Sequence, residues 1–408
     1  MLTQRQARHD IARLVLCQAL QATIIAGTLT TAALAGLMLL QQAQQPIILA
    51  TLPAALLFAA ALASTSFISQ LMAKRGRKSG FIIGISIGFI GYLVAGYALM
   101  LGSFSLFCLS SLAQGAFLAA SFYYRFTAID VVDATTTQHD HHHNKRQAQA
   151  IAWVLSGSVV AAFSGPNLAS WSSNWIEGYP YVGNYLVYAG LSLISLLIIA
   201  QLHVRLSVAV VTQPSAKDKQ RLRRSPVFVT AVMGSFVSYA VMSLIMNATP
   251  LAMQHHHGLQ ATAMVIQWHI FAMYAPSFFM GMIITRLGAP RVMQSGLMAY
   301  VICIAINTLS PSGADSFYQY LISLFLLGIG WNALFVSATH LLGLSYQPDT
   351  RAYAQGFNDV IMFSAITLST FSAGWLQQSL GFAGVNLITI PVVVIYFIWL
   401  RIKPLEAR

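Results

Sequence analysis

Charged residues are scarce in this chain of 408 residues: Asp, Glu, Lys and Arg make up 8% of it, against roughly 25% in an ordinary globular protein. A water-facing surface needs charge for its solvation, and a chain that is 57% hydrophobic has too little polar surface to cover its apolar atoms. The composition therefore excludes an ordinary soluble fold and predicts an integral membrane protein whose surface is covered by lipid.

Cysteine and the motifs of enzymes are also rare or absent. Cys17, Cys108 and Cys303 all lie in apolar stretches, so we read them as small buried hydrophobes and not as a disulfide framework. The chain has no nucleotide-binding Gly-Lys-Ser/Thr loop, no nucleophile beside an oriented base and no soluble domain to house either. We predict that it is not an enzyme and that it needs no cofactor.

The chain is instead rich in long apolar runs. About 20 apolar residues are needed to cross the bilayer as a helix, and continuous Leu, Ile, Val and Ala over such lengths excludes the alternating strands of a barrel. We predict an all-α membrane protein of twelve transmembrane helices in two six-helix bundles, with spans at 11–40, 46–72, 79–101, 103–126, 147–171, 179–205, 226–252, 260–285, 290–310, 314–343, 352–376 and 381–401. The predicted bundles are residues 1–205 and 226–408, joined by a linker at 206–225.

The basic residues mark one side of the membrane. The chain has 22 Lys and Arg against 10 Asp and Glu, and on the predicted map every Lys and Arg falls at the same face. The positive-inside rule assigns that face to the cytoplasm. We therefore expect a multi-pass protein of the inner membrane with both termini cytoplasmic. Since the cations do not cluster on a soluble domain, the net charge of +12 does not indicate a nucleic-acid partner.

The two halves of the chain carry matching features about 205 to 212 residues apart, which indicates an internal repeat. The loop after the second span contains Lys74, Gly76 and Arg77, and the loop after the eighth contains Arg286, Gly288 and Arg291. Each is a short turn in which a glycine lies between cations. Arg146 and Arg351 likewise open the fifth and eleventh spans beside small residues.

Twelve spans, a duplicated half and these two loops resemble the major facilitator superfamily of secondary transporters, over essentially the whole chain. The resemblance implies alternating access, in which two six-helix halves rock around a midplane site lined by the first, fourth, seventh and tenth spans. It also implies a gating role for Lys74, Arg77, Arg286 and Arg291 in the two loops.

Three departures from the family pattern bear on mechanism. Ala73 stands where the family's first loop has a gating Asp, and Ser111 stands where the fourth span often has an Arg linked to proton coupling, three residues before Gln114-Gly115. The fifth span has Gly165-Pro166 within a sequence similar to the Gly-rich antiporter motif, with alanines replacing two glycines. The coupling ion and the latch of the inward-closed state are therefore not assigned by the resemblance.

A narrower resemblance lies at the end of the fourth span. Tyr124-Arg125-Phe126 and Asp130, followed by Arg146 and Ser156-Gly157, are similar to a bacterial subgroup of the superfamily that includes riboflavin transporters. This similarity implies uptake of riboflavin or a similar small heterocycle, which we favour over the drug export implied by the partial antiporter motif.

Ionisable residues inside the membrane are candidates for coupling or gating, because a charge at the bilayer centre costs roughly 3 kcal/mol on insertion scales. Asp359 is the sole acid that enters a predicted span, where it carries a proton, orients substrate or pairs with a gate cation such as Arg75 or Arg77. His269 is either a proton carrier or a hydrogen-bonded packing residue. Arg125 and Asp130 are close enough for a local ion pair or a capping arrangement, for which a structural role is favoured.

Uncharged polar groups supply the predicted recognition surface. An amide ring with aromatic walls suits a neutral, partly aromatic solute better than a strongly ionic one, which would call for cations at mid-depth. The alternative is that each group only holds helices together. The candidate cavity residues are Gln18, Gln21, Gln114, Asn167, Asn247, His269, Trp331 and Asn332.

Two histidine runs resemble metal sites, His139 to His143 and His255 to His257. Adjacent histidines in loops do not hold tetrahedral geometry, and no cysteine or carboxylate cluster closes either site, so we predict no functional metal site. Metal transport stays an alternative, in which the second run collects a cation that Asp359 and His269 pass inward. The sequence thus predicts a monomeric secondary transporter of a small organic solute in the lipid bilayer, driven either by a coupling ion or by the solute's own gradient.

Overall fold

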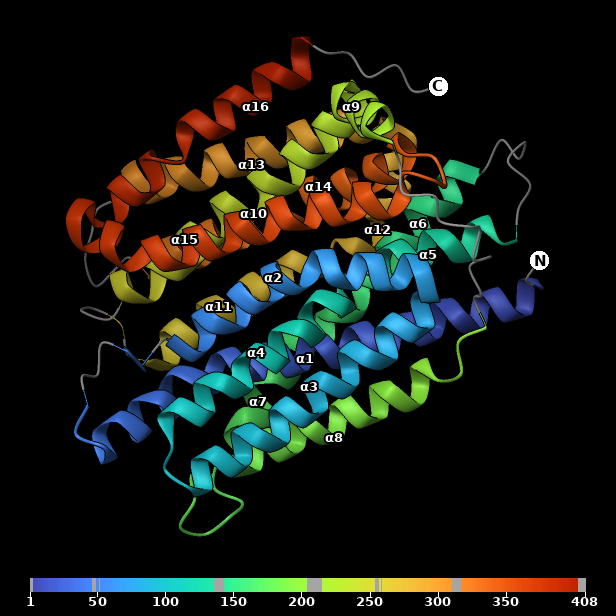
Figure 1. The fold of residues 1–408 in the computed structure, drawn as a ribbon. Helices are drawn as coiled ribbons and strands as arrows, with labels where there is room; N and C mark the ends of the chain where they lie inside the picture. The colour runs from blue at the N-terminus through green and yellow to red at the C-terminus, as the bar shows by residue number, and fades with distance from the viewer. Residues whose placement is uncertain are drawn as a thin grey trace. The chain divides into compact units, whose positions relative to one another are not determined.

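The computed structural model describes residues 3–45, 49–50, 52–135, 143–203, 215–253, 257, 259–309 and 317–402. In these residues all regular secondary structure is helical (Figure 1). The elements are α1 (Gln4–Gln42), α2 (Leu52–Arg75), α3 (Arg77–Met100), α4 (Phe104–Ser121), α5 (Tyr124–Asp133), α6 (His143–Ser156), η2 (Gly157–Val160), α7 (Ala161–Ser172), α8 (Val182–Ile199), α9 (Ala216–Arg224), α10 (Pro226–Met253), α11 (Leu259–Tyr274), α12 (Ser277–Leu287), α13 (Ala289–Leu309), α14 (Phe317–Ser345), α15 (Arg351–Leu387) and α16 (Ile390–Ile402).

The helices account for the twelve predicted spans. Ten helical stretches of the described chain are long and apolar enough to cross a membrane, and α11 with α12, bent by 43° at their junction, form another. One stretch, Arg351–Ile402, has 52 residues and would be about 78 Å long at 1.5 Å per residue, more than twice the ~30 Å of hydrocarbon. It is interrupted at Gly381, which has φ 69° and ψ 175°. It therefore contains the last two spans, and the prediction of twelve is confirmed.

By its internal contacts the chain divides into two compact units. The first unit is Met1–Gln138 with Val160–Thr212, and the second is His139–Val159 with Gln213–Arg408. The division falls inside the fifth predicted span, at η2: α6 packs on α12 in the second unit, whereas α7 packs on α1 in the first. The predicted bundle boundaries at residues 205 and 226 stay a prediction.

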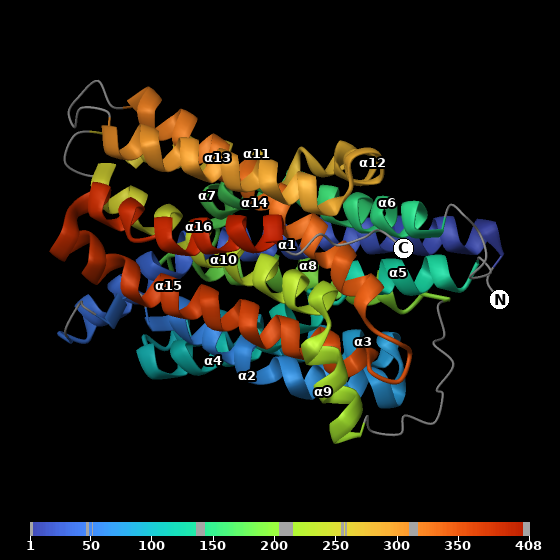
Figure 2. The same cartoon turned by 90° about the horizontal axis from the view of Figure 1, so that it is seen from above.

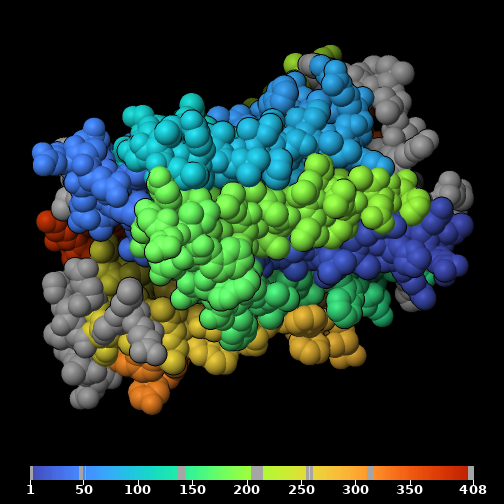
Figure 3. Space-filling model, turned by 90° about the horizontal axis from the view of Figure 1, so that it is seen from below, coloured from blue at the N-terminus to red at the C-terminus, as the bar shows by residue number. Residues whose placement is uncertain are grey.

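In the first unit, α3 packs along α4 on one side and along α8 on the other. Figure 3 shows α8, in green, lying beside α3, in light blue. Close approach to α4 depends on a glycine stripe, because Cβ atoms at Gly84, Gly88 and Gly91 would meet α4 side chains such as Phe117. Small residues at this spacing let helix backbones approach in a membrane, where hydrophobic burial does not drive association.

In the second unit, α10 packs against α14 and α15, and α13 packs against α14. The last helix, α16, lies beside α13 (Figure 2). Buried tyrosines join these helices through backbone acceptors: the Tyr300 hydroxyl donates to the Ser238 carbonyl at 2.8 Å, and the Tyr396 hydroxyl to the Thr230 carbonyl at 2.8 Å. Such pairing is required because an unsatisfied polar group in hydrocarbon costs several kcal/mol.

Candidate functional site

The same one-residue turn occurs once in each unit, at the two loops singled out by the sequence. Gly76 separates α2 from α3 with φ 85° and ψ 160°, and Gly288 separates α12 from α13 with φ 82° and ψ 144°. This backbone region is essentially restricted to glycine. The loops differ in their cations, because Lys74, Arg286 and Arg291 are exposed whereas Arg77 is buried.

Arg77 forms a buried ion pair with Asp130. Its Nε donates to Asp130 Oδ2 at 2.8 Å, and the guanidinium lies 5.3 Å from the ring centroid of Tyr123. The side chains of Arg77 and Asp130 are 4% and 0% exposed, so the pair is out of reach of water. Spacing in the sequence pointed from Asp130 to Arg125 and did not reveal this partner, which lies 53 residues away. The pair fastens the start of α3 to α5 inside the first unit.

Arg125 belongs to a cationic and aromatic cluster. Its guanidinium lies 4.5 Å from the ring centroid of Phe126 and 5.3 Å from that of Phe122. The Tyr124 ring instead packs against Phe81 of α3, at 4.8 Å between centroids. All these side chains except Phe122 are buried, so the cluster belongs to the interior of the first unit.

A second ionic cluster, which the sequence reasoning missed, ties α1 to the chain after α8. Asp10 is fully buried and accepts from the backbone N–H of His203 at 3.0 Å and from Arg13 at 2.9 Å. Lys78 donates to the neighbouring Leu202 carbonyl at 3.5 Å. The spacing of Asp10 and Arg13 on one helix was a visible signal for their pairing, whereas His203 lies 193 residues from Asp10.

The predicted cavity amides in the first unit differ in burial. Gln114 is 1% exposed, and its Nε2 lies 3.3 Å from Ser110 Oγ while its Oε1 has no hydrogen-bond partner. Gln21 is also buried and Gln18 is half-buried, both on α1. Asn167 on α7 is exposed and donates to its own helix, at the Phe163 carbonyl. Among these four predicted amides, Gln114 is thus the one with a buried oxygen that has no hydrogen-bond partner.

In the second unit, the Asn332 side chain forms hydrogen bonds on both sides of the break between α11 and α12. Its Nδ2 donates to the Met273 carbonyl at 2.7 Å and to Ser277 Oγ at 2.5 Å, where the chain turns at Pro276. Proline supplies no N–H and breaks the helical ladder, so carbonyls near it need other donors. Asn332 Oδ1 has no partner. Asn247 bonds within α10 and reaches Thr370 of α15 at 3.3 Å.

Trp331 is the centre of an aromatic cluster drawn from three helices. Its ring stacks on Phe335 at 4.9 Å and meets Tyr239 of α10 and Tyr274 of α11 edge-on at 5.3 and 5.4 Å between centroids. The side chain is 1% exposed, yet its indole Nε1 has no hydrogen-bond acceptor. A buried indole N–H is nearly always bonded, so this donor is available to a polar group that enters the cluster.

Asp359 and His269 are both fully buried in the second unit. Asp359 Oδ1 accepts from the side chain of the adjacent Asn358 at 2.9 Å. His269 Nδ1 lies 2.7 Å from the Leu324 carbonyl of α14, and because a carbonyl only accepts, Nδ1 carries a proton. Its Nε2 has no partner. The structure thus shows His269 hydrogen-bonded to α14. Proton transfer by Asp359 or His269 stays a prediction.

The described residues contain no group of three or more His, Cys, Asp or Glu arranged to hold a metal ion. Of the two histidine runs, residues 139–142 and 255–256 lie outside the described chain. The three cysteines are buried and unbonded to one another.

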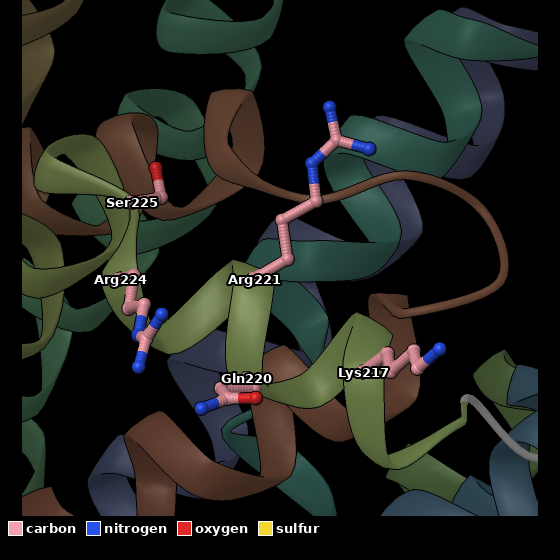
Figure 4. A pocket seen from close by; sticks show the side chains of 5 residues that line it. All are labelled: Lys217, Gln220, Arg221, Arg224 and Ser225. Atoms are coloured by element: carbon pink, nitrogen blue, oxygen red, sulfur yellow. The ribbon is translucent and has the colours of Figure 1, made fainter.

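A surface hollow on α9 is lined by Lys217, Gln220, Arg221, Arg224 and Ser225, whose side chains diverge from the helix (Figure 4).

Comparison with known proteins assigns the family. Residues 231–408 match the family model of the Major Facilitator Superfamily. The chain is 32% identical over 406 residues to the riboflavin transporter RfnT of Brucella anthropi, covering 98% of this chain and 97% of that protein. It is 27% identical to the uncharacterized MFS-type transporter YddS of Bacillus subtilis, covering 85% of this chain and 82% of that one.

Solved structures show the same fold at low identity. The fucose:proton symporter FucP of E. coli (N162A) superposes with a TM-score of 0.72 at 16% identity, over 97% of this chain and 98% of that chain. A bacterial homologue of the iron transporter ferroportin gives 0.72 at 13% identity, over 96% of this chain and 98% of that one.

Twelve apolar spans and a turn repeated in each half define a multi-pass membrane protein with an internal repeat. The chain belongs to the major facilitator superfamily, and it is accordingly a transporter of small solutes and not an enzyme.

Proposed function

We propose that this transporter takes up riboflavin, or a closely similar flat heterocycle, across the bacterial inner membrane with both termini in the cytoplasm. The observation that carries the proposal is the 32% identity to a riboflavin transporter over nearly the full length of both proteins. The basic residues, gathered at one face on the sequence map, support the orientation. We propose a monomer as the working unit.

The chemistry of the buried groups supports a flat, uncharged ring system. Trp331, Tyr239 and Phe335 offer aromatic faces and edges, and the unpartnered indole N–H of Trp331 is a donor for a ring carbonyl or nitrogen. In the same unit, Asn332 Oδ1 is a buried acceptor without a donor, suited to a ring N–H or hydroxyl group. A site that leaves polar groups unpaired rejects solutes that cannot pair them, so these atoms favour a solute with both donors and acceptors.

Binding is tested by thermal unfolding of the purified protein with riboflavin, other vitamins, drugs and metal salts, because a ligand that binds the folded state raises its stability. We expect riboflavin to raise the unfolding temperature of the wild type. Trp331→Phe keeps the aromatic face and removes the N–H, and should weaken riboflavin binding about tenfold, the effect of a hydrogen bond of about 1.4 kcal/mol. No shift with riboflavin at saturation contradicts the proposed substrate.

We further propose that Asp359 or His269 couples transport to a proton gradient. Asp359→Asn and His269→Gln remove the ionisable group and keep its approximate size. The residue that carries the proton is the one whose replacement abolishes the dependence of uptake on an imposed pH gradient. Unchanged dependence in both variants excludes both residues as proton carriers.

Efflux is a second candidate function, because of one contact in the first unit. Gly165, in the partial antiporter motif, packs directly on Ala26 and the Gly27 backbone of α1, and beside it Thr23 Oγ1 lies 2.6 Å from Ser164 Oγ. An exporter should give its host drug tolerance, whereas an importer should support a riboflavin-requiring host on limiting riboflavin. Metal transport, which depended on the run His255 to His257, stays an untested alternative.

A further inference from the structure

The short helix α9 of the second unit has two unlike faces, and one of them contacts α15. Leu222 is 6% exposed. Arg223 Nε donates to the Tyr353 hydroxyl at 2.5 Å, and its guanidinium lies 4.9 Å from the Phe357 ring centroid. Lys219 Nζ lies 5.4 Å from the Tyr353 ring centroid, so two cations of this face hold the start of α15. Stacking on aromatic faces explains why these cations are not simply solvated.

The opposite face of α9 is exposed and carries three further cations. Lys217, Arg221 and Arg224 recur at helical spacing, with Gln220 beside them, and all four side chains are exposed. Asp218 is the one acid of the helix. It forms a capping box with Ser215, and this hydrogen bonding, aided by Arg221, holds the pKa of its carboxyl below the ordinary value. Asp218 is thus ionised and bound at the helix start, and the exposed face keeps a net positive charge.

The position of α9 places this face at the boundary between membrane and water. Ser225 alone separates α9 from Pro226, where the spanning helix α10 begins, and Figure 2 shows α9 projecting from that end of α10. The residues that hold its other face, Tyr353 and Phe357, lie in the first two turns of α15, which opens another spanning stretch. The helix is therefore fixed beside the starts of two spans.

We propose that the exposed face of α9, defined by Lys217, Gln220, Arg221 and Arg224, binds the headgroups of acidic phospholipids. Seven residues of helix rise place Lys217 and Arg224 about 10 Å apart, and the side chains diverge (Figure 4). Diverging cations of this kind can contact several phosphates spread over a surface. They do not converge on one point, as binding of a single compact anion would require. Basic amphipathic helices with this placement are attracted to anionic membranes.

The test uses the purified full chain in detergent, titrated with phosphatidylglycerol or with phosphatidylcholine, with thermal unfolding as the measurement. We expect phosphatidylglycerol to raise the unfolding temperature and K217Q/R221Q/R224Q to need at least about tenfold more of it for half the effect, since each interfacial cation adds to the attraction. The matched control R5Q/R8Q/R401Q removes three exposed cations elsewhere and should stay within about twofold of the wild type.

Other outcomes overturn the proposal. If the α9 variant and the control respond alike to phosphatidylglycerol, the attraction is general and not a property of this face. If millimolar inorganic phosphate reproduces the stabilisation without lipid, the face takes a free anion. The single variant R221Q, at an exposed side chain, keeps the test valid if the triple variant does not fold, and should show part of the loss.

Discussion

The two copies of the repeated turn differ in the residues directly after the glycine. After Gly76 the next residue, Arg77, is buried and bonded to Asp130 at 2.8 Å. After Gly288 the chain continues through Ala289 and Pro290, and its cation, Arg291, is exposed. Both glycines have φ near 80° and an extended ψ. The repeat has therefore preserved the backbone turn, whereas the buried ion pair exists in one copy.

This difference shows that the similar cations of the two loops have unlike physical roles. Burying an ion pair costs desolvation that the pair must offset, and removing one partner leaves an uncompensated charge. An exposed cation in a loop is solvated, and its contacts contribute little. The loop cation of the first unit, Arg77, is therefore needed for packing. The loop cations of the second unit, Arg286 and Arg291, are exposed and are not part of its packed interior.

The largest effect is expected at the ion pair of the first unit. Asp130→Asn leaves Arg77 buried without its carboxylate and should destabilise the protein by about 3–5 kcal/mol, seen as a large drop in unfolding temperature. Arg291→Gln, its counterpart in the second loop, should change stability by less than about 0.5 kcal/mol. The double variant R77Q/D130N should recover part of the loss. Equal, small changes for D130N and R291Q would remove the distinction between the loops.

The glycines should behave alike where the cations do not. Gly76→Ala and Gly288→Ala each place a side chain in a backbone region restricted to glycine, and should each cost about 1–3 kcal/mol. A Cβ would meet nothing within 4 Å at Gly76, and only Pro290 Cδ at 3.9 Å at Gly288, so the cost is in backbone conformation and not in crowding. Thermal unfolding of the two variants measures it. A tolerated substitution at one site would show that the turns are not equivalent.

A smaller contrast is expected between amides of the two units. Asn332→Ala removes two hydrogen bonds at the break between α11 and α12 and should cost about 1–3 kcal/mol. Asn167→Ala removes one bond within an exposed helix face and should cost less than about 0.5 kcal/mol. If unfolding temperatures fall equally, the assignment of Asn332 to the break is wrong.

The sequence predicted the spans well because a run of apolar residues is a local signal. The turns at Gly76 and Gly288 were also visible, since glycine between cations is local. The Arg77–Asp130 pair was not, because its partners lie on different helices 53 residues apart. Helix α9 had a signal, the capping box Ser215 to Asp218, inside a segment that we interpreted as a linker. Asn332 was predicted to line a cavity, and only the structure revealed its bonds to Met273 and Ser277.

The most direct test of the central claim is uptake of radiolabelled riboflavin by proteoliposomes that contain the purified protein. We predict accumulation well above that of protein-free vesicles, competition by unlabelled riboflavin, and a reduction of about tenfold at subsaturating riboflavin in Trp331→Phe, in keeping with the loss of one hydrogen bond. Riboflavin that equilibrates no faster than in protein-free vesicles, with folded protein confirmed by its unfolding transition, would contradict the account.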